Sequence, residues 1–200
     1  MTVIGLTGPS GAGKGQVSRI MSEYCFHIID SDAVYHNIVS SPSPCVDELK
    51  SVFGQGVVNH DGALNRAALS AIVFKNGNQE KLSILNSITH KYVVIAIRDT
   101  ISKLKDEGAR VCVIDAPLLI EAGLLGDCDF SIAVLADKKT RIKRICERDG
   151  IDITSATSRI ISQKNDEYYI SNTDEVIYND GDMSDLEDDV KAILEERGVI

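Results

Sequence analysis

Five short apolar runs recur along the chain, at residues 3–6, 26–30, 111–115, 130–135 and 175–178. Most are continuous rather than alternating, which is typical of strands buried on both faces of a parallel sheet. Between them, apolar residues recur at helical spacing. The predicted helices are 16–25, 32–39, 45–53, 65–74, 78–105, 138–148, 155–163 and 184–197. This alternation predicts an α/β fold, a doubly wound sheet covered by helices.

Two local signals set helix boundaries. Residues 41–44 read Ser-Pro-Ser-Pro and predict a break between two helices. Ser184 and Glu187 have the spacing of a capping box, which predicts that the last helix begins there.

The spacing of the strands predicts a core with two insertions. Roughly 80 residues separate the second strand from the third, more than a crossover requires, so we expect a helical substrate-side insert at about 32–108. A basic segment in an otherwise acidic chain, at about 137–171, is interpreted as a lid that closes on phosphates. The alternative for this segment is a solvated charged helix. The core is then 1–31, 109–136 and 172–200, all within one domain.

Composition limits the possible functions. The chain has 200 residues, 44% of them hydrophobic, which suffices for one core. A net charge of −9 argues against general nucleic-acid binding, which needs a basic surface. The five cysteines form no C-x-x-C pair, and Cys25, Cys112 and Cys146 are interpreted as core residues. With neither a signal-peptide pattern nor a long apolar stretch, we expect a cytoplasmic monomer that contacts no membrane.

Residues 8–15, Gly-Pro-Ser-Gly-Ala-Gly-Lys-Gly, follow the first strand and precede a helix. This is the phosphate-binding spacing G-x-x-x-x-G-K, in which glycines turn backbone N–H groups toward an anion and Lys14 adds a charge. The position after the lysine, usually Ser or Thr, is Gly15. A ligand-free glycine turn is the alternative, whereas a dinucleotide fingerprint is excluded because its third glycine position is Gln16.

Acidic residues follow two of the predicted strands, at the edge where α/β sheets bind ligands. Asp30 and Asp32 point the same way in an extended chain, so one can orient a magnesium-bound water and the other accept a proton. The alternative is a helix N-cap by Asp32, with Asp30 ending the strand. Asp115 ends the third strand and is predicted to hold magnesium through water, or else to cap a helix. The apolar stretch Leu118-Leu119-Ile120 is predicted to line a substrate wall.

Arg141, Arg144 and Arg148 share one face of a predicted helix and can spread charge over a migrating phosphoryl group. Glu147 could instead pair with Lys143. A lone helical histidine such as His90 is more often structural than a ligand contact.

Over nearly its whole length the chain resembles the dephospho-coenzyme A kinase family. The matching segments include 4–8 with the loop, 30–32 followed by His36, 64–66, 72–74, 88–90, 144–149, 159–163 and 176–179. The most specific is Asp115-Ala-Pro-Leu-Leu-Ile-Glu-Ala-Gly at 115–123. The resemblance implies a three-layer P-loop nucleoside-kinase-like fold with a five-stranded parallel sheet.

The resemblance also implies ATP-dependent phosphorylation of the ribose 3′-hydroxyl of dephospho-CoA, with Mg²⁺. Lys14 would bridge the β and γ phosphates, Asp32 would activate the hydroxyl, and Arg144 and Arg148 would stabilise the transferring group. The implied ATP contacts are Gly8, Ser10, Gly11, Ala12, Gly13, Lys14, Gly15, Gln16 and Asn179. The expected substrate contacts are Thr7, Asp32, Arg66, His90 and Leu118, and the expected metal contacts, through water, are Asp115 and Asp30.

The loop departs from the family at Gly15 and Gln16, and Lys91 stands where proline is frequent. The loop itself is similar to that of cytidylate kinases, so a nucleoside monophosphate kinase is one alternative. Only Arg66 and Arg98 are arginines between 33 and 108, which leaves little for a monophosphate clamp. The second alternative is a pseudokinase that binds ATP without turnover. The GTPase motifs N-K-x-D and D-x-x-G are absent from the sequence.

Overall fold

The computed structural model describes residues 1–74 and 79–200. It contains two compact units, one formed by Met1–Ile29 with Ile101–Ile200 and the other by Asp30–Thr100. The roles predicted for the insert and the lid concern ligands, so they stay predictions.

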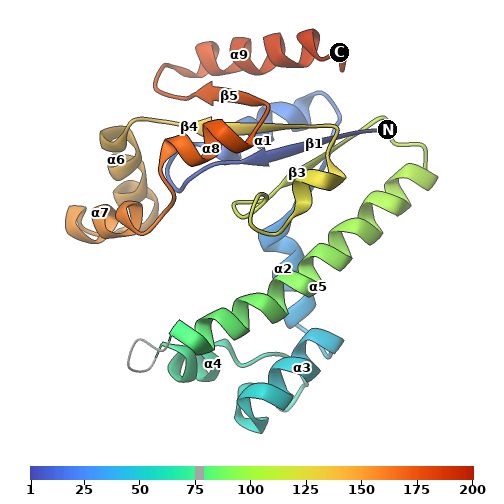
Figure 1. Cartoon of the computed structure of the whole chain (residues 1–200), viewed down its shortest axis with the longest axis vertical. Helices are drawn as coiled ribbons and strands as arrows, with labels where there is room; N and C mark the ends of the chain where they lie inside the picture. The colour runs from blue at the N-terminus through green and yellow to red at the C-terminus, as the bar shows by residue number, and fades with distance from the viewer. Residues whose placement is uncertain (75–78) are drawn as a thin grey trace. The chain divides into compact units, whose positions relative to one another are not determined.

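The first unit contains a five-stranded sheet (Figure 1). Its strands are β1 (Thr2–Thr7), β2 (His27–Asp30), β3 (Val111–Asp115), β4 (Phe130–Leu135) and β5 (Glu175–Tyr178). Their order is β2-β3-β1-β4-β5. β1 runs parallel to β3 and to β4, and β4 runs parallel to β5. All five strands lie where the sequence predicts them, which confirms the α/β fold.

Burial differs between the centre and the edges of the sheet. β1, β3 and β4 are buried along almost their whole length, as continuous apolar runs predict. The edge strands β2 and β5 each have one buried residue, Ile29 and Ile177. The prediction of burial on both faces, made for most of the strands, therefore holds for the three central strands and not for these two.

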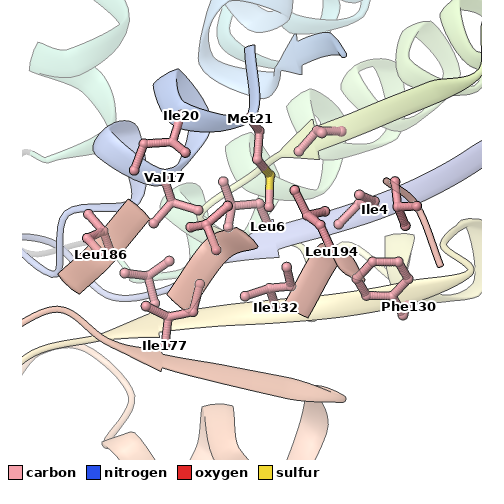
Figure 2. Close-up of a cluster of buried hydrophobic side chains, with 14 of the residues drawn as sticks. Ile4, Leu6, Val17, Ile20, Met21, Phe130, Ile132, Ile177, Leu186 and Leu194 are labelled. Carbon is pink, nitrogen blue, oxygen red and sulfur yellow. The ribbon is translucent and has the colours of Figure 1, made fainter. Parts of the chain in front are cut away.

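Helices α1 (Lys14–Glu23) and α9 (Met183–Glu196) pack on one face of the sheet. Figure 2 shows their side chains meeting those of β1, β4 and β5. The residues labelled there are Ile4, Leu6, Val17, Ile20, Met21, Phe130, Ile132, Ile177, Leu186 and Leu194. Each aliphatic side chain of this size contributes about 1.5–3 kcal/mol when fully buried. This core fixes the start of α1, and with it the end of the phosphate-binding loop.

The rest of the first unit follows β3 and β4. Its elements are η3 (Leu124–Asp127), α6 (Lys138–Asp149), α7 (Ile153–Ile161) and α8 (Asp166–Asn172). α6 and α7 share a small core around Ile145, Ala156 and Ile160. Tyr169 of α8 packs on Ala133 and Leu135 of β4. The sequence reasoning missed α8, because seven residues are too few to show a helical period.

The second unit is helical. Its elements are α2 (Ser31–Val39), α3 (Pro44–Phe53), η1 (Gln55–Val57), α4 (Arg66–Val73) and the part of α5 (Gln79–Asp106) up to Thr100. They enclose their own core, which includes Val39, Leu49, Leu69, Val73 and Ile88. The start predicted for α5, residue 78, lies outside the described residues.

Several predicted boundaries are wrong. α9 begins at Met183 and its capping box is Asp182 with Asp185, because an aspartate at the N-cap position accepts the first N–H groups as a serine would. Pro44 is the first residue of α3 rather than part of the break, since a first-turn residue needs no N–H.

α1 spans Lys14–Glu23, and Cys25 beyond it has a positive φ of 60° and is exposed, so its prediction as a core residue is wrong. Cys112 is buried as predicted, and Cys146 is partly buried. In the described part of the chain no helix has both the length and the apolar character needed to cross a membrane.

Candidate nucleotide-binding site

The phosphate-binding loop leads from β1 into α1, as the sequence predicts. Gly8, Gly11 and Gly13 have φ values of 145°, 83° and 97°, which favour glycine. Gly13 is the left-handed N-cap of α1, and no side chain of the described residues caps this helix. The first N–H groups of α1 are therefore not satisfied by a capping side chain, which is the usual condition at an anion-binding helix terminus.

Lys14, the first residue of α1, and Asp115, the last residue of β3, form an ion pair. Lys14 Nζ donates to the Asp115 carboxylate, and Asp115 is only 6% exposed. Residues 117–123 form turns, so the alternative that Asp115 caps a helix is wrong. The pairing brings together a phosphate-binding cation and a carboxylate suited to magnesium-bound water.

Two arginines of α6 bind the carbonyl groups of the loop. Arg141 Nε donates to the Ser10 carbonyl at 3.0 Å, and Arg144 Nη1 donates to the Ala12 carbonyl at 3.3 Å. Arg141 is 4% exposed, and burial lowers its pKa although the Asp166 carboxylate opposes this effect. Because α6 begins directly against the loop, Arg141 and Arg144 are part of its support.

Arg148 lies one turn further along the same face and is exposed. It donates to Asp149 and, at 3.3 Å, to the Ser10 hydroxyl. Asp149 also binds Arg159 of α7, and hydrogen bonds from Arg148 and then Arg159 lower the pKa of Asp149 to about 2. The predicted shared face of the three arginines is confirmed, while the Lys143–Glu147 pair is also present, at 4.0 Å.

Asn179 follows β5 and is 4% exposed. Its side-chain amide donates to the Ala12 carbonyl at 2.9 Å and to Gln16 Oε1 at 3.1 Å. A Cβ added to Gly13 would lie 2.0 Å from Asn179 Nδ2, so glycine is required for this approach. Asn179 thus stabilises the loop through the Ala12 carbonyl. Its predicted contact with ATP stays a prediction.

Gln163 is a residue of this region to which the sequence reasoning assigned no role. Its Oε1 accepts from the Ser10 N–H at 3.2 Å and from Arg141 Nη2 at 2.8 Å. In the sequence, Gln163 ends the segment 159–163 that resembles the dephospho-CoA kinase family, but no role was assigned to it.

Thr7 and Leu118, both predicted to contact substrate, differ in exposure. Thr7 is completely buried and its hydroxyl donates to the Pro117 carbonyl at 3.2 Å. Leu118 is 44% exposed, while its neighbour Leu119 is completely buried and so belongs to the core rather than to a substrate wall. The predicted ligand contacts of Thr7 and Leu118 stay predictions.

The predicted acids after β2 have different local roles in the second unit. Asp30 is the N-cap of α2, its Oδ1 accepting from the N–H groups of Asp32 and Ala33 at 2.8 and 3.1 Å. The alternative that Asp32 is the cap is therefore wrong, because the helix begins one residue earlier than predicted. Asp32 lies exposed in the first turn. Its predicted part in catalysis and the predicted metal contact of Asp30 stay predictions.

Arg66 and His90 also lie in the second unit. Arg66 is the first residue of α4, contacts the His36 ring, and lies 5.7 Å from the centre of the Tyr35 ring. Burial raises the pKa of Tyr35, and the nearby Arg66 partly opposes that rise. His90 is half-buried within α5. The predicted acceptor contacts of Arg66 and His90 stay predictions.

The chain is similar to known proteins over almost its full length. The dephospho-CoA kinase family model matches residues 2–185. A dephospho-CoA kinase of Corynebacterium glutamicum is 35% identical over 196 residues, which are 98% of this chain and 97% of that protein. One from Carboxydothermus hydrogenoformans is 36% identical over 98% of this chain and 94% of that protein.

Solved structures give the same fold. TT1252 from Thermus thermophilus aligns with a TM-score of 0.79 and 29% identity over 98% of this chain and 97% of that one. Dephospho-CoA kinase from Campylobacter jejuni aligns with a TM-score of 0.72 and 23% identity over 99% and 98% of the two chains, which supports the fold. Together with the loop, the Lys14–Asp115 pair and the family match over residues 2–185, these similarities show that the chain belongs to the dephospho-CoA kinase family.

Proposed function

We propose that this protein transfers the γ-phosphoryl group of ATP to the ribose 3′-hydroxyl of dephospho-CoA, giving CoA and ADP in the last step of CoA synthesis. The observation that carries the proposal is the intact loop with its Lys14–Asp115 pair in a chain that matches the family over residues 2–185. In the reaction the acceptor oxygen bonds to the γ-phosphorus, the bond from that phosphorus to the β,γ-bridging oxygen breaks, and the hydroxyl proton is released.

Lys14 is the residue we assign to the β and γ phosphates. In the structure Lys14 pairs with the Asp115 carboxylate. Phosphate oxygens offer Lys14 an alternative anion, which would leave Asp115 available for a metal-bound water. Such transfer depends mainly on positioning and charge neutralisation, which this pair can supply.

Magnesium would neutralise phosphate charge and fix the geometry of the phosphates. Among the described residues no three His, Cys, Asp or Glu side chains are grouped to hold a metal. The donor set fits an ion held mainly by phosphates and water, with the Asp115 carboxylate beside Lys14 as the protein contact and Asp30 as a further predicted contact. Gly15 offers no hydroxyl for it.

The exposed Asp32 is the group we assign to orient the acceptor hydroxyl and accept its proton. Arg148, exposed and next to the Ser10 hydroxyl, is assigned to the transferring phosphoryl group. Arg144 was predicted for the same task, but its guanidinium donates to the Asn179 carbonyl at 3.0 Å as well as to the loop. These contacts favour a positioning role for Arg144. We further propose that the protein acts as a monomer in the cytoplasm.

A coupled ADP-release assay with dephospho-CoA, CMP and AMP in parallel tests the proposal. We expect turnover with dephospho-CoA and at most slow turnover with CMP and AMP. Turnover with CMP alone would identify a nucleoside monophosphate kinase. Tight ATP binding without any turnover would favour the pseudokinase, for which Gly15 is the motivating observation.

A further inference from the structure

The backbone N–H and the backbone carbonyl of Ser10 both bind side chains that lie more than 130 positions away in the sequence. Its carbonyl accepts from Arg141 Nε at 3.0 Å, and its N–H donates to Gln163 Oε1 at 3.2 Å. The same Gln163 oxygen accepts from Arg141 Nη2 at 2.8 Å. Ser10, Arg141 and Gln163 therefore form a closed ring of three hydrogen bonds, which we call the Ser10 clamp.

The clamp determines the direction of the next N–H group. In a trans peptide the carbonyl of one residue and the N–H of the next point in opposite directions. Because the Ser10 carbonyl points toward Arg141, the Gly11 N–H points away from α6. The same reasoning applies one peptide further on, where the Ala12 carbonyl faces Arg144 and Asn179 and directs the Gly13 N–H away from them.

α6 and the loop also fit closely at Gly11. A Cβ added to this glycine would lie 2.7 Å from the backbone oxygen of Arg141, and Gly11 has a φ of 83°. The fully buried Ile145 lies 3.1 Å from the same point. The loop thus rests against the α6 backbone, so a small displacement of Arg141 would be passed to the peptide groups that face phosphate.

Gln163 completes this arrangement chemically. Arg141 is 4% exposed, and its other guanidinium nitrogen, Nη1, reaches Asp166 at 3.7 Å. A buried guanidinium donor without an acceptor is unfavourable, and so is a loop N–H without one. A single side-chain carbonyl oxygen satisfies both, which an apolar side chain of the same size cannot do.

We propose that Gln163 is a positioning residue for ATP: by accepting from Ser10 and Arg141 it fixes the loop peptides whose N–H groups bind the β and γ phosphates. Gln163 itself touches no phosphate in this role. The proposal rests on ATP being the ligand of the loop, as in the proposed function. Beyond the proposed function, the affinity for ATP should depend on the amide oxygen of Gln163, a residue between α7 and α8.

The test compares Gln163→Leu, which removes the acceptor, with Gln163→Glu, which keeps two acceptor oxygens beside Arg141. Ser162→Ala is the matched control, since Ser162 is exposed and its hydroxyl donates to the nearby Arg159 carbonyl at 2.8 Å. The Kd for ATP is measured without acceptor, by displacement of a fluorescent ATP analogue. The KM for dephospho-CoA and the Tm are measured on the same preparations.

We expect Gln163→Leu to raise the Kd for ATP roughly tenfold, the effect of one or two lost hydrogen bonds to a charged group. Gln163→Glu and Ser162→Ala should stay within about twofold of the wild type, and the KM for dephospho-CoA should be unchanged throughout. If Gln163→Leu does not fold, Gln163→Met, which is unbranched and equally long, takes its place.

An unchanged Kd for ATP in a folded Gln163→Leu or Gln163→Met protein would overturn the proposal. Equal losses in ATP affinity and dephospho-CoA KM, or no recovery in Gln163→Glu, would also overturn it, because they indicate general damage rather than loop positioning. Wild-type protein that binds ATP but does not phosphorylate dephospho-CoA would contradict the proposed function alone, since the ATP affinities are measured without acceptor.

Discussion

The polar residues around the phosphate-binding loop and those of the second unit are held in different ways. Around the loop, Arg141, Asp115 and Asn179 are buried, and their partners are distant in the sequence, as with Asn179 and Ala12, 167 positions apart. In the second unit Asp32 and Arg66 are exposed. Burial in a closed network strengthens each hydrogen bond and fixes geometry, whereas exposed groups remain solvated and adaptable.

We propose that this difference separates donor binding, around the loop, from acceptor binding, in the second unit. Hydrogen bonds from Arg141, Arg144 and Asn179 already hold the loop, so the binding energy of ATP need not be spent on ordering it. We propose that the exposed side chains of the second unit, such as Asp32 and Arg66, engage the acceptor when it binds. We therefore expect substitutions near the loop to act on ATP affinity and stability, and substitutions in the second unit to act on turnover and acceptor use.

The largest expected effect is that of Asp32→Asn. Loss of the carboxylate should lower kcat by about 10²-fold or more, because the acceptor hydroxyl loses its orienting and proton-accepting partner. The Kd for ATP should be unchanged. Steady-state kinetics and the fluorescent-analogue displacement measure the two quantities, with Asp47→Asn, an exposed aspartate of α3, as control. A near-normal kcat would remove Asp32 from the active site.

Asn179→Leu tests the buried residues around the phosphate-binding loop. It leaves the Ala12 carbonyl and Gln16 without their amide partner, so we expect stability to fall by about 1–3 kcal/mol. The KM for ATP should rise and that for dephospho-CoA should not. Urea unfolding and kinetics test this, with Asn172→Ala as control because the Asn172 amide donates to the Tyr168 carbonyl within the same helix, α8. Equal changes in both KM values would contradict the separation of donor and acceptor sides.

Gly15→Ser should have a smaller effect and should change only the dependence of activity on magnesium concentration. Among the described residues, no atom beyond the adjoining residues and the local backbone of α1 lies within 4 Å of a Cβ at Gly15, so a serine side chain has room there. It supplies the oxygen usual at this position of the loop, and we expect half-maximal activity at a few-fold lower magnesium concentration. Gly15→Ala controls for the gain in helix propensity, about 1 kcal/mol at most. An unchanged magnesium titration would show that the side chain at position 15 does not affect magnesium binding.

The smallest effect concerns Asp149 between Arg148 and Arg159. The pKa of Asp149 is lowered to about 2 in the folded chain, so its ion pairs stabilise the protein above the ordinary aspartate pKa and are lost as pH falls toward 2. The Tm of Asp149→Asn should thus lie below that of the wild type at pH 6, and the gap should narrow below pH 4. A gap independent of pH would show that the carboxylate charge contributes nothing there.

The sequence was sufficient for much of the fold because its signals are local. The bounds of β3, β4 and β5 agree with the apolar runs. For β3 and β4 the reason is that a central strand needs apolar residues on both faces. The errors are equally physical. α8 is too short to show a period, and the true cap of α9, Asp182, lies two residues before the serine that matches the capping pattern.

The residues of the site show the same difference between local sequence signals and long-range contacts. The loop from Gly8 to Lys14 and the acid Asp115 were identifiable because their chemistry is written in consecutive residues after a strand. Gln163 was not identified, because its two partners, Ser10 and Arg141, come near only after α6 and α7 have packed. From its charge alone, Arg144 could as well bind the transferring phosphoryl group. Its three contacts with oxygens of Ala12 and Asn179 indicate instead that it positions the loop.

By itself, the sequence determined the α/β alternation, the phosphate loop, the strand-end acids and the family, because each depends on local spacing or on the order of short motifs. Only the tertiary structure decided that Arg141 is buried, that Lys14 pairs with Asp115, and that Gln163 closes the ring around Ser10. Those relations join residues far apart in the chain, and no local pattern records which distant polar groups will meet once a common core excludes water.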